Sequence, residues 1–295
     1  MSPAESGVGR LKGALLIICA SFIFNLQLIT LKVDVETVIL KFGGAAVAKT
    51  EQFSLIADII LNKSLTARVV VVVSAMGDST DQLLSLARQV HPNPPLREQD
   101  MLVSAGERIS VSLLAMALHL KNRDAISYTG SQSGIITSAK HTDARIVEVR
   151  PHRILKALGA GKIVIVAGFQ GVSREGEITT LGRGGSDTSA VALGVGLEAS
   201  KVEFYKDVAG VFSEDPKNNS AAVLFDSLSY EEALEITEGG SKVLHSRCIK
   251  LAAKNNLPLH VLSFYDPALQ HHSGTLIGPL QRPAHCPYVF EGEYE

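Results

Sequence analysis

The sequence predicts an α/β fold, a three-layer α/β/α sandwich built on a mainly parallel, open sheet. Two observations lead to this prediction. From residue 37 onward, short runs of β-branched and other apolar residues, bounded by Gly, Ser, Asp or Pro, alternate with longer stretches of helical pattern. The strand runs are continuously apolar, which is typical of strands buried on both faces of a parallel sheet with helices on each side.

Taken in order, the elements fall between residues 37 and 262. The buried strands are expected at residues 37–42, 69–75, 125–128, 162–168, 202–205 and 259–262. Helices are expected over about residues 50–62, 80–90, 106–121, 151–159, 186–199, 229–238 and 245–255. The polar run 170–181 has a glycine turn and predicts a hairpin. Residues 91–100 contain three prolines, which exclude a helix interior, so this segment is expected to be a surface excursion between helices.

The first 36 residues do not follow this pattern. Residues 13–31 are 19 uncharged residues preceded by Arg10 and Lys12, which is long enough for a membrane span. Asn25 and Gln27 weaken that interpretation, and no small-residue cleavage site of a secretory signal follows. We expect residues 1–36 to be an apolar extension outside the fold, and a real membrane segment is the alternative.

Composition excludes several classes of protein. A chain of 295 residues that is 46% hydrophobic can bury a large core. Its net charge of −2 argues against a nucleic-acid or anionic-membrane partner. The three cysteines have no C-x-x-C spacing, which fits a reducing compartment and neither a disulfide framework nor a zinc site.

Two glycine-rich segments point to an anionic ligand. Residues 179–195 read TTLGRGGSDTSAVALGV, in which glycines and Arg183 precede a helical run. Ser186 is a candidate N-cap and Asp187 needs a cation, while the helix dipole favours an anion at this end. Residues 37–44 read TVILKFGG, a strand that ends in Lys41 and a glycine turn. This arrangement brings a cation to phosphate at the carboxyl end of a sheet, although the spacing is not that of a Walker A loop.

These two segments, with residues 68–84, 102–118, 202–217 and 228–247, resemble the aspartokinase family in the same order, over about residues 37–278. The resemblance implies the amino acid kinase fold over residues 37–279. It also implies ATP-dependent phosphorylation of the L-aspartate side-chain carboxylate, with Mg²⁺, as a cytoplasmic first step towards lysine, threonine and methionine. L-aspartate and ATP are then the small-molecule partners; nucleic acid and membrane are not expected, and a homodimer remains open.

The resemblance also implies roles for single residues. Lys41 would contact the transferring phosphoryl group, and Gly43 and Gly44 would allow close backbone approach. Lys242, in GGSKVLH, matches a second lysine near the nucleotide phosphates, and Asp187 would orient the two lysines. On the nucleotide side the matching residues are Lys206, Asp207, Phe212 and Lys217. No residue is assigned as a metal ligand.

For the amino acid, Arg183 matches an arginine that clamps a carboxylate, and Glu107 matches the acid that takes the substrate ammonium. A glutamate in a first helical turn is also favoured by the helix dipole alone. The remaining residues expected on the substrate side are Ser74, Thr80, Phe169 and Ser186.

The chain departs from the family pattern at several positions. The usual KFGGTS is KFGGAA here, so Ala45 and Ala46 replace two hydroxyls expected near phosphate or substrate. Lys206 stands where threonine is common, and Ser246 replaces a proline. Two alternatives to an active aspartokinase stay open. One is a kinase of another acid or of a nucleoside monophosphate from the same superfamily, against which the matched segments SAGER and LGRGGSDT argue. The other, motivated by Ala45 and Ala46, is a binding protein without turnover.

The C-terminal end is short in comparison with the family. Family members usually carry two regulatory ACT modules after the kinase domain, and only 16 residues follow residue 279 here. A segment of that length is below the size at which a domain folds alone. Residues 280–295 are therefore expected to be a short tail, with no regulatory module in this chain.

Overall fold

The computed structural model describes residues 35–214, 216, 218–219, 221–241, 243–265, 274–280 and 288–292. The apolar run 13–31, Lys217 and Lys242 lie outside the described residues. A compact unit begins at Glu36, one residue before the start expected from the sequence pattern.

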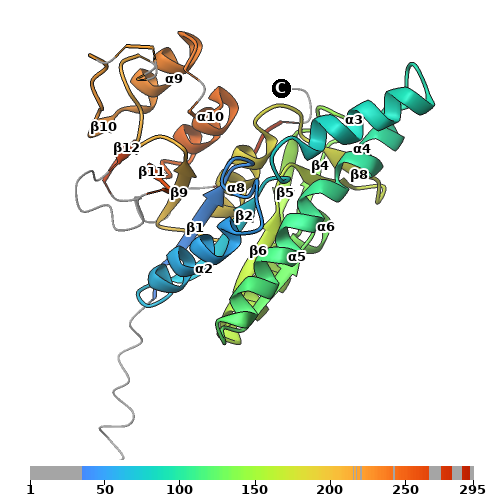
Figure 1. The fold of residues 1–295 in the computed structure, drawn as a ribbon, viewed down its shortest axis with the longest axis horizontal. Helices are drawn as coiled ribbons and strands as arrows, with labels where there is room; N and C mark the ends of the chain where they lie inside the picture. The colour runs from blue at the N-terminus through green and yellow to red at the C-terminus, as the bar shows by residue number, and fades with distance from the viewer. Residues whose placement is uncertain are drawn as a thin grey trace, which may run out of the picture. The chain divides into compact units, whose positions relative to one another are not determined.

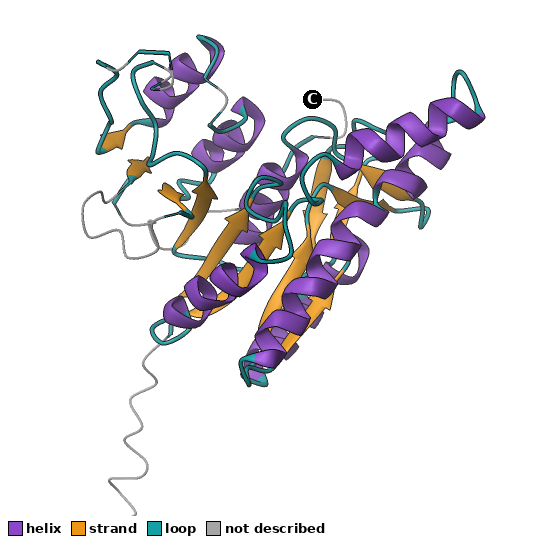
Figure 2. Ribbon diagram, viewed as in Figure 1, coloured by secondary structure: helices purple, strands orange, loops and turns teal. Residues whose placement is uncertain are grey.

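The centre of this unit is an eight-stranded sheet (Figures 1 and 2). Its strands, in spatial order, are β10 (Ser227–Leu228), β12 (Thr275–Ile277), β11 (Leu259–Ser263), β9 (Lys201–Lys206), β1 (Thr37–Phe42), β2 (Arg68–Val73), β6 (Ile163–Ala167) and β3 (Ala125–Tyr128). All neighbours pair in parallel except β11 and β12, which are antiparallel. The mainly parallel sheet and its six predicted buried strands are confirmed.

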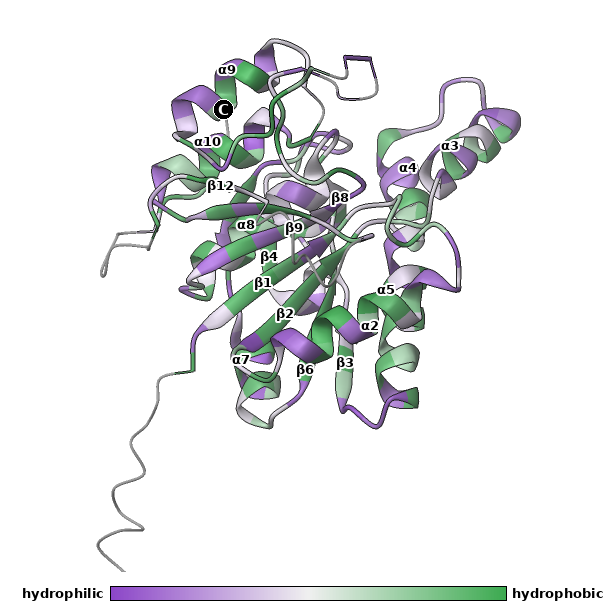
Figure 3. Cartoon of the chain, turned by 60° about the vertical axis from the view of Figure 1, so that its left-hand side comes forward, coloured by the Kyte–Doolittle hydropathy of each residue, from purple (hydrophilic) through white to green (hydrophobic). Residues whose placement is uncertain are grey.

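Helices cover both faces of the sheet, as predicted. The described helices are α2 (Gln52–Lys63), α3 (Ser79–Val90), α4 (Leu96–Val103), α5 (Ala105–Leu120), α6 (Gly130–Ser133), α7 (His152–Gly159), α8 (Gly185–Gly196), α9 (Tyr230–Glu238) and α10 (Ser246–Lys254). Among them, α3 packs mainly on α4 and has no buried residue. Val69 and Val71 of β2 belong to the apolar cluster with α2 and α5, whereas Val70 and Val72 belong to the cluster with α7, α8 and α10. This alternation explains why the central strands β1 and β2 are mostly hydrophobic along their length (Figure 3).

A second sheet of four short strands lies beside the first. Its order is β5 (Ile146–Val149), β4 (Ile135–Thr137), β7 (Gln170–Ser173) and β8 (Ile178–Thr180). The antiparallel pair β7 and β8 is the predicted hairpin. Strands β4 and β5 were not predicted, because runs of three or four residues give no clear periodicity.

The expectation for residues 91–100 is wrong in its second half. Pro94 and Pro95 precede α4, and Pro95 occupies the N-cap, where its missing N–H costs nothing. Asp100 lies inside the helix and is fully buried. The run Leu96–Leu120 is long and apolar enough for a membrane span by composition, but half of its most apolar window is buried in the fold, as in a core helix.

Candidate active site

Strand geometry brings two lysines to one place. Along β1, Ile39 and Lys41 point to the face that α8 covers, and along β9, Phe204 and Lys206 point to the same face. Both lysines stand at the carboxyl end of their strand. Helix α8 packs on β1, β2 and β9, and Asp187 is in its first turn. The fold therefore places one carboxylate between two ammonium groups.

These three side chains form a buried ion triad, called the Asp187 triad below. Oδ1 of Asp187 pairs with Nζ of Lys41, and Oδ2 lies 3.1 Å from Nζ of Lys206. The exposed fractions of the side chains are 8% for Asp187, 5% for Lys41 and 16% for Lys206. Burial alone would raise the pKa of Asp187, but the two ammonium groups outweigh it and hold this pKa at about 2. Burial lowers the pKa of Lys41, and Asp187 opposes that shift.

The glycine-rich turn before α8 takes its shape from two left-handed residues, Gly182 (φ 71°) and Gly184 (φ 69°). A Cβ on Gly184 would collide with the His245 ring, so glycine is required there. Gly184, not Ser186, is the N-cap of α8, which corrects the sequence prediction. Ser186 is the second residue of the helix, where it lines a pocket at the positive end of the helix dipole.

The turn after β1 brings backbone close to Lys41. A Cβ on Gly43 would stand 3.5 Å from Nζ of Lys41, and one on Gly44 would stand 3.1 Å from the carbonyl oxygen of Ala75. Ala46 donates its N–H to the carbonyl of Gly43 at 3.0 Å, which closes the turn. Ala46 is 1% exposed and belongs to the apolar core, while Ala45 is exposed. Neither alanine is among the residues that line the two pockets described next.

A pocket of about 280 Å³ opens between the two glycine turns. Most of the residues predicted on the substrate side line it. They are Ser74, Thr80, Glu107, Phe169 and Ser186. The lining also includes Lys41, Gly44 and Asp187, which were predicted at the phosphates, together with Ala75, Gly77, Gly184 and Gly185. Arg183 is exposed on the turn that borders the pocket, and its side chain is not among the lining groups.

Glu107 is the second buried carboxylate of the site. It lies in the first turn of α5, is 2% exposed, and accepts the N–H of Ala75 at 3.1 Å through Oε1. Oε2 has no hydrogen-bond partner among the described residues. Burial raises the pKa of Glu107 to about 7, although backbone N–H groups and Lys41 partly oppose the shift. A buried oxygen of this kind is suited to an ammonium group that arrives with a ligand.

Phe169 holds an unusual backbone conformation at the pocket wall, with φ of 67°. Such a φ is rare for an aromatic residue and persists only when its surroundings enforce it. Here the Phe169 N–H donates to Oγ of Ser189 at 3.1 Å. A Cβ on Gly168, the residue before Phe169, would stand 2.9 Å from Cβ of Ser186. The strand end after β6 and the start of α8 are thus packed directly against each other.

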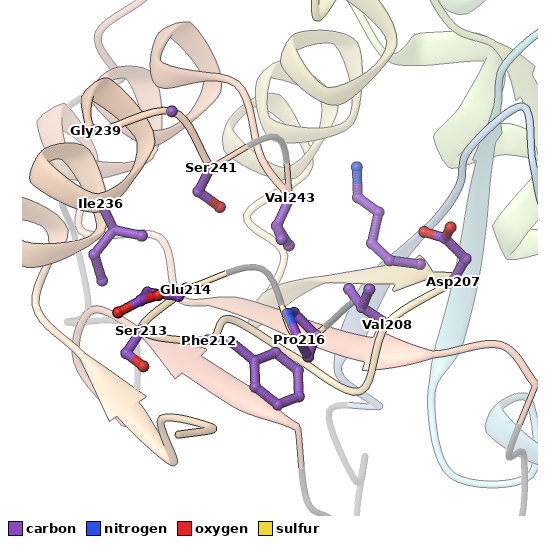
Figure 4. A pocket seen from close by; sticks show the side chains of 12 residues that line it. Asp207, Val208, Phe212, Ser213, Glu214, Pro216, Ile236, Gly239, Ser241 and Val243 are labelled. Atoms are coloured by element: carbon purple, nitrogen blue, oxygen red, sulfur yellow. The ribbon is translucent and has the colours of Figure 1, made fainter. Parts of the chain in front are cut away.

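A larger pocket of about 660 Å³ lies on the other side of Lys206 (Figure 4). Phe212, Ser213, Glu214 and Pro216 form one wall, and Ile236, Gly239, Ser241 and Val243 form the facing wall. Lys206, Asp207 and Phe212 were predicted on the nucleotide side, and all three line this pocket. The wall from α9 and the following loop was not predicted, because the resemblance assigned a role only to Lys242 in residues 236–243.

The Asp187 triad joins the two pockets. Lys41 and Asp187 line the smaller one, and Lys206, which is paired with Asp187, lines the larger one. Two ligands, one in each pocket, would therefore approach each other beside the ammonium groups of Lys41 and Lys206. Within the described part of the chain, no group of three His, Cys, Asp or Glu side chains is arranged to hold a metal ion without help from a ligand.

Comparison with known sequences identifies the fold. The sequence pattern of the amino acid kinase family matches residues 36–263. The chain belongs to this family. The aspartokinase of Mycolicibacterium smegmatis is 51% identical to it over 231 residues, which are 78% of this chain and 55% of that protein. The chain thus spans about half the length of the curated relatives it matches.

Solved structures of the amino acid kinase family agree with this assignment. The aspartate kinase from Synechocystis matches with a TM-score of 0.75 and 42% identity, over 87% of this chain and 42% of that one. Aspartokinase III of E. coli, solved in complex with aspartate and ADP, matches with a TM-score of 0.74 and 29% identity, over 85% of this chain and 65% of that one.

Proposed function

We propose that this chain transfers the γ-phosphoryl group of ATP to the side-chain carboxylate of L-aspartate. The observation that carries the proposal is the Asp187 triad at the junction of two pockets of different size. Phosphoryl transfer needs little covalent chemistry from the protein, but it needs positioning and cations where the charge moves. Lys41 and Lys206 supply those cations.

The smaller pocket suits a short zwitterion. Oε2 of Glu107 is a partner for the ammonium group of aspartate, and Ser74 and Thr80 offer hydroxyls for its oxygens. We propose that Arg183, on the turn at the edge of the pocket, pairs with the α-carboxylate once the substrate is bound. The reacting side chain then points to Lys41.

The larger pocket suits a nucleotide. Its volume of about 660 Å³ falls in the range of small-molecule sites, and it combines the Phe212 ring with polar groups. The carboxylate of Asp207 fits Mg²⁺ carried by ATP, because Mg²⁺ is commonly held by one or two carboxylates together with phosphate oxygens. Lys217 and Lys242 remain predictions for the phosphate end of this pocket.

The reaction requires no general base. The side-chain carboxylate of free aspartate has a pKa near 3.9 and is ionised at neutral pH. Its oxygen attacks the γ-phosphorus, the bond from that phosphorus to the bridging oxygen breaks, and ADP leaves with the electron pair. The ammonium groups of Lys41 and Lys206 offset the negative charge that is brought together. Asp187 favours the charged form of Lys41, since it opposes the effect of burial on the Lys41 pKa.

The relatives support the choice of substrate. A protein with 51% identity over most of this chain is an aspartokinase, and E. coli aspartokinase III has been solved with aspartate and ADP. We further propose that the product enters the synthesis of amino acids derived from aspartate, in the ATP-containing cytoplasm.

Trapping the acyl phosphate tests the proposal. Purified chain is incubated with Mg²⁺-ATP, L-aspartate and hydroxylamine, and aspartyl hydroxamate is measured by its iron complex. Parallel reactions contain L-glutamate, N-acetyl-L-glutamate or UMP, and the release of ADP is measured in each, because phosphorylated UMP forms no hydroxamate. Hydroxamate with aspartate alone is the expected result. Turnover only with another acceptor would identify a different kinase, and nucleotide binding without turnover would identify a binding protein.

A further inference from the structure

Residues 288–292 pack against the kinase domain, although they belong to the segment expected to be a short tail. The Val289 N–H donates to Oδ1 of Asn255 at 2.9 Å, and Nδ2 of Asn255 donates to the Val289 carbonyl at 2.8 Å. Two residues later, Glu291 donates its N–H to the carbonyl of Ile146 at 2.9 Å. The Ile146 N–H in turn donates to Oε2 of Glu291 at 2.8 Å. Residues 288–292, called the C-terminal strap below, thus bridge α10 and β5.

The strap brings a buried carboxylate to Arg247 in the first turn of α10. Glu291 is 9% exposed, and its carboxylate takes two N–H groups of the Arg247 guanidinium, with Nη2 at 2.7 Å from Oε2. The same guanidinium donates to the carbonyl of Ala144 at 2.6 Å and to the carbonyl of Leu181. One side chain therefore ties the strap to two loops of the domain.

Both loops border the glycine-rich turn of the smaller pocket. Leu181 directly precedes Gly182, where the turn begins. A Cβ on Gly182 would stand 3.0 Å from the carbonyl oxygen of Thr142, so the loop of Ala144 packs closely on the turn. Ala144 donates its N–H to the carbonyl of Thr180 at 2.9 Å. Arg247 thus contacts the residues that flank the turn, while its own side chain does not line the smaller pocket.

We propose that Arg247, paired with Glu291, is a positioning residue that fixes the turn 181–187 in its ligand-binding shape. Docking of the C-terminal strap thereby sets the affinity for the amino-acid substrate. A guanidinium can donate to two carbonyls and a carboxylate at once, because its N–H groups form a rigid fork. Without the carboxylate the buried cation is left uncompensated and moves towards water, which releases Leu181 and Ala144. The identity of the ligand rests on the proposed function; the role of Arg247 does not.

Steady-state kinetics tests this role with two variants and a matched control. Glu291→Gln removes the charge but keeps the shape, and Arg247→Lys keeps the charge but removes the fork. The control is Lys250→Gln, on the same helix, whose exposed side chain lies 3.6 Å from Glu238. We expect both variants to raise the KM for aspartate on the order of tenfold, because a misplaced binding group loses much of its effect. The KM for ATP should stay within about twofold in all three proteins.

Hydrogen exchange of the unliganded chain gives a readout that does not depend on the substrate. The amides of residues 182–187 should exchange faster in Glu291→Gln and Arg247→Lys than in Lys250→Gln. If the wild type does not phosphorylate aspartate but the turn still exchanges faster in these two variants, the role of Arg247 is supported and only the proposed function fails. Unchanged exchange in the turn, or a lower melting temperature with both KM values unchanged, would overturn it and leave Arg247 a purely structural residue.

Discussion

Strand β9 contributes to two clusters that have the same composition and different surroundings. The Asp187 triad joins one carboxylate to Lys41 and Lys206 on the face under α8. On the opposite face, Glu203 is 1% exposed and lies 2.8 Å from Nζ of both Lys63 and Lys201. Each cluster is a buried carboxylate between two lysines, so charge alone does not distinguish a structural site from an active one.

The difference lies in what the lysines can reach. The side chains of Lys63 and Lys201 are 27% and 33% exposed, and neither lines one of the two pockets. Glu203 also accepts the hydroxyl of Tyr205 at 3.1 Å, which satisfies it further. In the Asp187 triad the ammonium groups are more deeply buried and lie at two pockets. A cation of this kind is partly desolvated before a ligand arrives, which strengthens its electrostatic effect on that ligand.

Removing the shared carboxylate should have the largest effect at the triad. Asp187→Asn leaves two lysines without a counter-charge, and the pKa of Lys41, already lowered by burial, should fall further. We expect aspartate-dependent turnover at pH 7.5 to fall about a hundredfold, with a loss of roughly 3 kcal/mol in stability. Hydroxamate formation and chemical denaturation measure the two effects. Turnover within about threefold of the wild type would show that the triad is structural.

The equivalent change in the other cluster should affect stability alone. Glu203→Gln should lower the free energy of unfolding by about 1–2 kcal/mol, since its lysines are partly exposed and can turn to water. The Glu203 pKa is lowered in the fold, because its two lysines outweigh burial. Its contribution is therefore present above about pH 4.5 and is lost as the pH falls through the lowered value. Thermal melts at pH 7 and pH 3 should show a gap between variant and wild type that narrows in acid. A tenfold loss of turnover in Glu203→Gln would contradict the claim that this cluster affects stability alone.

Glu107 extends the comparison to a carboxylate without a lysine partner. Its pKa is raised to about 7, so the folded chain binds its proton more tightly than the unfolded chain does. Stability should therefore fall as the pH rises from about 4.5 to 7, and Glu107→Gln should melt higher than the wild type at pH 8 but not at pH 4. The ionised form is the one that holds an ammonium group. In the wild type, kcat/KM for aspartate should therefore drop about tenfold per pH unit below 7. A flat profile from pH 6 to 8 would remove Glu107 from substrate binding.

The smallest effect is expected at the position that departs from the family pattern. Ala46→Ser places a hydroxyl in the apolar core and away from both pockets. We expect kcat/KM for either substrate to change by less than about threefold and stability to fall by about 1 kcal/mol. Steady-state kinetics and a thermal melt suffice. A tenfold gain in kcat/KM would mean that residue 46 faces the ligand after all.

Much of the fold could be predicted because the strands are buried on both faces. Runs such as residues 69–75 are too apolar to form a loop, and the alternation with helices allows few topologies. The small sheet was predicted only in part: the glycine turn indicated the hairpin of β7 and β8, whereas β4 and β5, of three and four residues, were missed. Helix α4 escaped because the prolines that precede it were taken to govern the whole segment, whereas Pro95 limits only the start of the helix.

The site was predictable where a motif coincides with a strand end or a helix start. Lys41 and Asp187 are of this kind, since strand parity and the first turn of α8 bring them together. Glu291 and Arg247 were not predictable, because their contact joins residues 44 positions apart and depends on how the strap folds back. The N-cap was predicted two positions too late, at Ser186, because the left-handed residue Gly184 takes that place.

The most direct test compares one lysine from each cluster in the hydroxylamine assay. Lys41→Ala and Lys63→Ala each remove one ammonium group from a buried carboxylate, Asp187 of α8 and Glu203 of β9 respectively. The predicted result is a loss of initial hydroxamate rate of at least about a hundredfold for Lys41→Ala, and a rate within about twofold of the wild type for Lys63→Ala. Equal rates in the two variants would contradict the claim that position at the two pockets, and not charge composition, makes the Asp187 triad the centre of phosphoryl transfer.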